Sequence, residues 1–199
     1  MEALIAILAG GRGSRLGGEK ASIDLAGAPL ISRPLAAARS AAGELDVAVV
    51  AKPGTPLPPL DATVIREPAE PTHPLCGIVA ALRAGDGRAV VAVACDMPFV
   101  TGELLRWLAS LEDPLAVPRA QGRLQPLLAR YGPSLLEPLE AALGDGRPLG
   151  ETVAALAPRE IDERELGRFG APELLLFNVN TPADLEAAER LAGPGRLRE

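Results

Sequence analysis

The stretch Leu8-Ala9-Gly10-Gly11-Arg12-Gly13-Ser14-Arg15-Leu16-Gly17-Gly18-Glu19-Lys20 decides how the rest of the chain is interpreted. It follows an apolar run at 3–8, which predicts a short buried strand that opens a parallel sheet. Its five glycines let the backbone turn tightly and direct N–H groups at a bound anion. Three basic side chains add positive charge to the same segment. The stretch therefore predicts a phosphate-binding loop directly after the first strand.

Two common phosphate-binding motifs do not describe this loop. A Walker A motif needs lysine directly after its second glycine, but Gly18 is followed by Glu19. The dinucleotide fingerprint Gly-x-Gly-x-x-Gly meets Leu16 at its last position when started at Gly11, and Arg15 at its third when started at Gly13. The alternative without a function is a surface loop that arginines keep soluble.

Bulk properties limit the classes of protein to consider. A chain of 199 residues can bury a core, and we expect one domain over 1–192 with a frayed tail over 193–199. The net charge of −6 argues against a broad nucleic-acid surface. Two cysteines and one histidine exclude a disulfide scaffold and a structural zinc site. With no signal peptide and no apolar run near ~18 residues, we expect a cytoplasmic protein that does not engage membranes.

Strands and helices alternate along the chain. Apolar runs predict strands at 3–8, 22–25, 46–51, 62–65, 89–94, 115–118, 124–131 and 174–178. Helical spacing and end signals predict helices at 29–42, 74–84, 102–111, 133–143, 149–156 and 182–191. Pro29 is expected in the first turn of its helix, and Thr101 and Thr181 are expected as N-caps. The pattern predicts an α/β fold: a three-layer α/β/α Rossmann-like domain with a mostly parallel central sheet and ligands at the carboxyl ends of its strands.

Asp96 stands two residues beyond the most apolar run, 89–94, which we expect to be the central strand. A carboxylate near a buried strand end is costly unless a cation compensates its charge. Mg²⁺ suits this position because it takes one or two carboxylates together with phosphate oxygens and water. The structural alternative is a turn or N-cap aspartate before the helix at 102.

Four segments together resemble one family. They are the loop 8–20 with Leu25-x-Gly27-x-Pro29-Leu30 behind it, His73-Pro74-Leu75-Cys76-Gly77, Cys95-Asp96-Met97-Pro98-Phe99, and Phe177-Asn178-Val179-Asn180-Thr181-Pro182. The sequence resembles the molybdenum cofactor guanylyltransferases of the MobA-like nucleotidyltransferase family. The first and third segments are shared widely among nucleotidyltransferases with a glycosyltransferase-A-like fold, whereas Asn-Val-Asn-Thr-Pro is typical of the molybdopterin-using branch. Within that branch, the resemblance associates the Leu-Ala-Gly-Gly opening with guanine rather than cytosine nucleotides.

The resemblance implies roles for the matching residues. Those implied to contact the nucleotide are Leu8, Ala9, Gly10, Gly11, Arg12, Lys20, Glu67 and Asp96. Arg15, Lys20 and Asp96 would be catalytic, the two cations holding the triphosphate and Asp96 binding Mg²⁺. Glu67 would help to recognise the base, and Asn180 would face the pterin. Glu19, Leu16 and His73 depart from the usual residues, but none of these changes removes a charge from the loop.

The implied reaction joins GMP from GTP to the terminal phosphate of molybdopterin and releases pyrophosphate. GTP and molybdopterin would be the substrates, with transient contacts to other proteins of molybdenum cofactor biosynthesis. The acceptor is already an anion, so in-line positioning and charge neutralisation suffice without a general base. Alternatives are a molybdopterin cytidylyltransferase, a nucleotidyltransferase for another small phosphorylated acceptor, or a non-catalytic nucleotide-binding module.

Three further residues have competing interpretations. Lys52, one of two lysines against eighteen arginines, is interpreted as a solvated loop residue. His73 fits a surface loop as well as a contact to the base. Asn180 would either meet the pterin or merely order the turn before the last helix. We expect Lys20 and Asn180 to belong to two different sides of the site, one for the triphosphate and one for the pterin.

Overall fold

The computed structural model describes residues 3–10, 20–41, 43 and 45–193. Eight of its strands share one sheet: β1 (Ala3–Leu8), β4 (Asp46–Ala51), β5 (Thr63–Arg66), β6 (Ala89–Ala94), β7 (Leu115–Ala120), β8 (Arg123–Leu124), β9 (Leu128–Tyr131) and β10 (Arg159–Ile161). The order across the sheet is β10-β7-β9-β6-β1-β4-β5, with β8 paired to β7. Within this sheet β8 and β9 run against the other strands, so the sheet is mostly parallel, as predicted.

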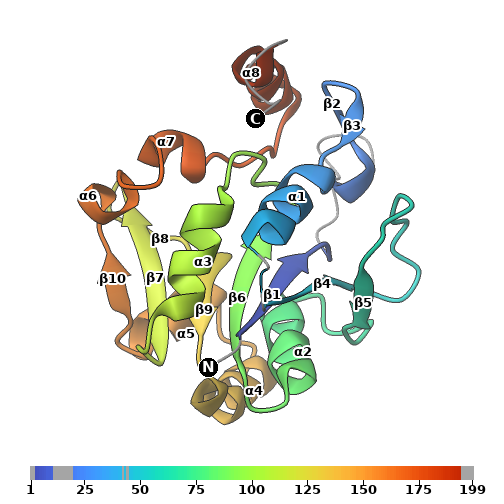
Figure 1. The fold of residues 1–199 in the computed structure, drawn as a ribbon. Coiled ribbons are helices and arrows are strands. Elements are labelled where there is room, and N and C mark those ends of the chain that lie inside the picture. Colours follow the sequence, from blue (N-terminus) through green and yellow to red (C-terminus); the bar gives the residue numbers. More distant parts are fainter. Residues whose placement is uncertain (1–2, 11–19, 42, 44, 194–199) are drawn as a thin grey trace.

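Helices cover both faces of the sheet. They are α1 (Ser32–Ala41), α2 (Leu75–Gly85), α3 (Gly102–Ser110), α4 (Leu136–Gly144), α5 (Leu149–Ala155), α6 (Glu163–Leu166), α7 (Pro172–Leu175) and α8 (Pro182–Ala192). Successive strand residues point to opposite faces. Ile5 and Ile7 of β1 pack in one core with α1 and α3, whereas Leu4 and Ala6 pack in a second core with α2, α4 and α5. Figure 1 shows how these helices lie around the sheet. The predicted three-layer α/β/α arrangement is confirmed.

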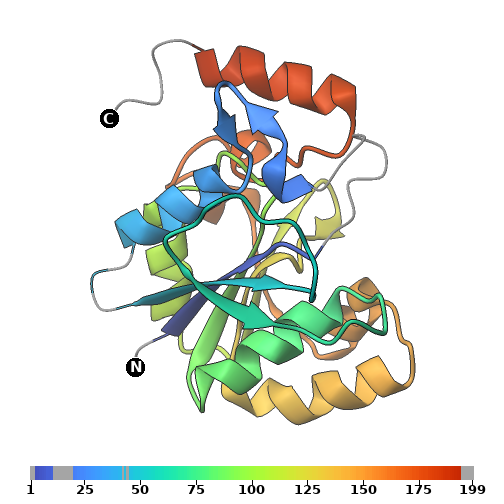
Figure 2. The same ribbon diagram turned by 90° about the vertical axis from the view of Figure 1, so that its right-hand side faces the viewer.

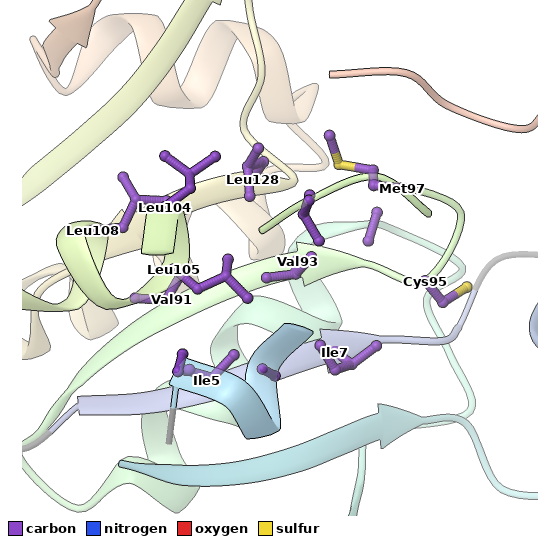
Figure 3. Close-up of a cluster of buried hydrophobic side chains, with 14 of the residues drawn as sticks. Ile5, Ile7, Val91, Val93, Cys95, Met97, Leu104, Leu105, Leu108 and Leu128 are labelled. Atoms are coloured by element: carbon purple, nitrogen blue, oxygen red, sulfur yellow. The ribbon is translucent and has the colours of Figure 1, made fainter. Parts of the chain in front are cut away.

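The central strand is β6. Each of its six residues is buried, and it lies between β9 and β1 in the middle of the sheet. Figure 3 shows Val91 and Val93 of β6 beside Ile5 and Ile7 of β1, with leucines of α3 above them. A strand buried on both faces has no polar positions, which is why its apolar run predicted both its bounds and its place.

The segment after the phosphate-binding stretch corrects one prediction. Pro29 does not open a helix, because Asp24–Leu25 (β2) and Ala28–Pro29 (β3) pair as a small antiparallel hairpin, and α1 begins at Ser32. The hairpin turns through Ala26 and Gly27, whose φ angles are +54° and +84°. Two left-handed residues in a two-residue turn match the twist of paired strands. The turn geometry therefore wins over the helix-start signal of the proline.

The late strand predicted at 174–178 is wrong. Pro172–Leu175 forms the short helix α7, and the last strand of the sheet is instead β10, which pairs in parallel with β7. A short apolar run is compatible with either structure, and Pro172 at the first helical position favours the helix. β10 escaped prediction because two of its three residues, Arg159 and Glu160, are charged.

A third, small core lies at the carboxyl end of the sheet. Leu25 and Leu30 from the hairpin region pack there with Val179 and with Ala188 of α8. Figure 2 shows α8 lying beside the β2–β3 hairpin. The predicted N-cap of α8 is confirmed, because Oγ1 of Thr181 accepts a hydrogen bond from the N–H of Asp184. Across the described residues, no helix is long and apolar enough to cross a membrane. The predicted frayed tail lies, from residue 194 on, outside the described residues.

Candidate functional site

A pocket of about 250 Å³ opens at the carboxyl ends of the central strands. Its walls come from the ends of β1, β4 and β6, from the segment after β5, and from the start of α2. The chain passes from β1 to β4 on one side and returns as β6 on the other side of β1. Such a switch point is where open α/β sheets bind their ligands. The pocket therefore lies at the place that the fold predicts.

Two predicted site residues that line this pocket, Lys20 and Asp96, form an ion pair, and Lys20 also contacts a third, Asn180. The ammonium Nζ of Lys20 donates to Oδ2 of Asp96 at 2.5 Å and to Oδ1 of Asn180 at 2.6 Å. The side chains of Lys20 and Asp96 are only 16% and 12% exposed, so water screens their ion pair weakly. The side chains of Lys20 and Asn180 touch, so the two predicted sides of the site would adjoin at this contact.

Asp96 keeps one carboxylate oxygen without a partner among the described residues. Oδ1 is buried and makes no hydrogen bond there, whereas Oδ2 receives the Lys20 ammonium. A buried charged oxygen left unpaired is costly, so a bound cation would stabilise it. Among the described residues no cluster of three or more His, Cys, Asp or Glu side chains could hold a metal ion. A site with one carboxylate suits Mg²⁺, which draws its other ligands from phosphates and water.

Asn180 reaches Lys20 because the segment before α8 is fixed from three directions. The N–H of Val179 donates to the carbonyl of Asp96 at 2.9 Å. Phe177 packs edge-on against Phe99 with ring centroids 5.8 Å apart. The carboxylate of Asp184 accepts from the backbone N–H of Asn180. The turn is thus ordered through the backbone of Asn180, and its side-chain oxygen is used for Lys20.

Glu67 is buried, at 5% exposed, and lies close to two glycines of the pocket. A methyl group at Gly10 would overlap its Oε1, and one at Gly77 would lie 3.4 Å from its Oε2. Burial raises the pKa of Glu67, and the nearby positive charge of Lys52 opposes that rise. Small residues therefore leave room for a carboxylate at the pocket wall, where it can accept hydrogen bonds from a ligand.

Leu8 and Ala9 use backbone groups to extend the sheet. The carbonyl of Leu8 accepts from the N–H of Cys95 at 3.1 Å, and the N–H of Ala9 donates to the carbonyl of Val50 at 2.8 Å. Leu8 also lines the pocket, whereas Ala9 packs in the core on the α1 and α3 side. Three predicted site residues, Gly11, Arg12 and Arg15, lie outside the described residues.

Lys52 is a residue that the sequence interpretation missed. It is not a solvated loop residue, because its ammonium donates to the carbonyls of Pro68, Ala69 and Pro71. It also lines the pocket. The scarcity of lysine was the available signal, since the two lysines of the sequence, Lys20 and Lys52, line the same pocket.

His73 lies at the start of α2. Its Nδ1 accepts a hydrogen bond from the N–H of Leu75 at 3.2 Å, so it satisfies a backbone donor of the first turn. The residue is partly exposed and also lines the pocket. Both interpretations of His73, as a loop residue and as a neighbour of a bound base, are therefore compatible with its position.

Comparison with known proteins places these features in a family. A family model described as the MobA-like NTP transferase domain matches residues 5–160. A probable molybdenum cofactor guanylyltransferase of Pelotomaculum thermopropionicum is 31% identical over 98% of this chain and 96% of that protein. The molybdenum cofactor guanylyltransferase of Cereibacter sphaeroides is 35% identical over 93% of this chain and 94% of that protein.

Comparison with solved structures supports the same family. The molybdopterin-guanine dinucleotide biosynthesis protein A of Archaeoglobus fulgidus has a TM-score of 0.78 and 27% identity, covering 95% of this chain and 98% of that one. A 2-C-methyl-D-erythritol 4-phosphate cytidylyltransferase of Thermus thermophilus shares the fold, with a TM-score of 0.69 over 96% of this chain and 99% of that one, at 24% identity. The mostly parallel sheet with its ligand pocket at the switch point is a nucleotidyltransferase fold. The chain belongs to the MobA-like NTP transferase family.

Proposed function

We propose that this chain transfers GMP from GTP to the terminal phosphate of molybdenum-bound molybdopterin, giving the guanine dinucleotide cofactor and pyrophosphate. The family supports nucleotidyl transfer, and relatives at 31–35% identity carry the guanylyltransferase name. The observation that carries the proposal is that Lys20 and Asp96 line the same pocket as Glu67, while Lys20 also contacts Asn180.

The pocket allows a nucleotide to lie across the end of β1. Asp96 follows β6 and Glu67 follows β5, on opposite sides of β1 in the sheet. A guanine beside Glu67 could donate its N1–H and amino hydrogens to the carboxylate. The phosphates would then extend toward Lys20 and Asp96. Asn180, which touches Lys20, would meet the second substrate at the far end.

The chain needs no catalytic base for this reaction. The acceptor phosphate is an anion, so the residues must hold two anionic substrates in line and neutralise the charge that develops on pyrophosphate. Lys20 supplies a fixed positive charge, and its two partners hold the ammonium in place before substrate arrives. We propose that Asp96 would hold Mg²⁺ through Oδ1, where the ion would supply further neutralisation of phosphate charge.

The remaining parts of the proposal concern the whole chain. Residues 1–192 would work as one domain, since Asn180 at one end of this range contacts Lys20 near the other. We propose a cytoplasmic location, which suits a sequence with only two cysteines, Cys76 and Cys95.

Calorimetric titration with GTP, CTP and ATP in the presence of Mg²⁺ tests the choice of nucleotide. We expect GTP to bind most tightly and pyrophosphate to be released only when molybdopterin is added. Tighter binding of CTP would move the chain to the cytidylyl branch. Absence of pyrophosphate release with every nucleotide would leave a binding module and overturn the enzymatic proposal.

A further inference from the structure

Lys52 holds the segment that follows β5. Its Nζ donates to the carbonyl oxygens of Pro68 at 2.8 Å, Ala69 at 2.9 Å and Pro71 at 3.2 Å. An ammonium group has three N–H donors, and these three carbonyls can engage all of them. Hydrogen bonds from a charged donor are stronger than neutral ones. Lys52 therefore fixes the path of this segment.

The geometry requires lysine in particular. Three carbonyls that converge on one point suit a compact ammonium, whereas the guanidinium of arginine directs its donors in a plane. The chain otherwise uses arginine for positive charge, eighteen times against two lysines. The other lysine, Lys20, likewise has its ammonium bound by more than one acceptor.

The held segment forms one wall of the pocket. Glu67 precedes it, tied to β4 by a hydrogen bond from its N–H to the carbonyl of Ala51 at 3.1 Å. Thr72, His73 and Pro74 follow it, and all three line the pocket together with Glu67. The carbonyl of Pro71 also accepts from the thiol of Cys76 on α2, so the segment is fastened on its far side as well.

We infer that Lys52 is a positioning residue for base recognition: by binding the carbonyls of 68, 69 and 71, it sets the place of the Glu67 carboxylate and of the wall 72–74 against the nucleobase. This inference rests on the proposed function and deepens it. Lys52 touches neither the phosphates nor the acceptor in this scheme. Its loss should therefore change discrimination between bases and leave binding of the triphosphate intact.

The test uses Lys52→Met, which keeps the aliphatic stem and removes the charge and all three donors. Binding of GTP, CTP and ATP is measured by calorimetry with Mg²⁺, and KM and kcat for the preferred nucleotide are measured with molybdopterin. We expect the preference among bases to fall about tenfold, as for the loss of one charge-assisted hydrogen bond to the base. KM should rise while kcat at saturation stays near the wild-type value. Arg83→Met, which removes a surface cation paired with Glu140, is the matched control and should change neither quantity.

The outcomes separate this inference from the proposed function. If the wild type prefers CTP, guanylyl transfer is wrong, but Lys52→Met must still lose the preference that the wild type shows. A variant with the wild-type ratio of affinities overturns the inference, as does one that weakens all three nucleotides equally. If Lys52→Met does not fold, Lys52→Arg provides the test, because it keeps the charge and loses the threefold geometry. An unchanged preference in that variant also counts against the inference.

Discussion

Gly10→Ala probes whether Glu67 recognises the base. The backbone of Gly10 is not left-handed, so alanine can adopt its conformation, but the added methyl group would overlap Oε1 of Glu67. The carboxylate is the end of a flexible side chain, and its Oε1 would have to move from 2.1 Å to about 3.4 Å or more from the methyl group to reach an ordinary contact distance. A hydrogen bond of ~2.9 Å to guanine would then stretch beyond the useful range. The methyl group thus acts on the nucleotide through Glu67.

The size of the effect follows from the charged acceptor. A hydrogen bond to an ionised carboxylate contributes ~1.5–3 kcal/mol, so losing one lowers GTP affinity by about 10- to 100-fold. Calorimetric titration should show this loss for GTP and little change for ATP, which lacks the N1–H and the amino group at that position. Gly77→Ala is the matched control, because its methyl would lie 3.4 Å from Oε2 of the same carboxylate and 3.3 Å from Cδ2 of Leu8, so that the carboxylate need not withdraw. Equal loss of GTP and ATP affinity in Gly10→Ala would refute the role of Glu67, since it would mean that the methyl group blocks every nucleotide.

Three further predictions concern Asp96, Asn180 and the protonation of Glu67. Asp96→Asn should stay folded but lose pyrophosphate release and Mn²⁺ binding measured by electron paramagnetic resonance; wild-type turnover would contradict the metal assignment. Asn180→Ala should raise the molybdopterin concentration needed for half-maximal rate and, because Asn180 holds Lys20, lower the affinity for GTP modestly. A lower melting temperature with unchanged dependence of the rate on both substrates would instead mean that Asn180 only orders the turn. Burial raises the pKa of Glu67, so the fold favours its protonated form: Glu67→Gln should be more stable than wild type at neutral pH, and the difference should shrink as the pH falls below that pKa. GTP affinity of the wild type should fall over the same acid range, and a flat pH profile of GTP binding would count against an ionised Glu67.

The central parallel strands could be predicted from sequence to the residue. Apart from the exposed Asp46, the runs 3–8, 46–51 and 89–94 are apolar because the sheet is covered on both faces, and no competing pattern obscures their ends. The type and bounds of the short elements could not be predicted in this way. Pro29 satisfies a helix start and a strand edge equally well, and the choice was made by a turn whose two positive φ angles no periodicity reveals. β10 was hidden by its charged residues.

Some features of the site could be predicted from the sequence, and others could not. Asp96 was predictable because it follows a buried strand, and Lys20 was predictable because it ends a glycine-rich stretch. Their contact with Asn180 was not, since 160 residues separate Lys20 from Asn180 and nothing in the sequence orients the last helix on the hairpin. Lys52 was missed because its role depends on three carbonyls that converge only when the segment after β5 has its final path.

The contact between Asn180 and Lys20 also has a consequence for how the molecule is made. Contacts of long sequence separation close a large loop and form late during folding. Domains fold from their N-terminal part onward during synthesis, so the strands of the sheet are available before residue 180 emerges. A nascent chain can therefore carry the sheet and the ion pair of Lys20 with Asp96 before the contact of Lys20 with Asn180 forms. Pulse-labelling hydrogen exchange should show the amides of β1 and β6 protected earlier than those of 177–180, so that the contact of Asn180 with Lys20 is completed last.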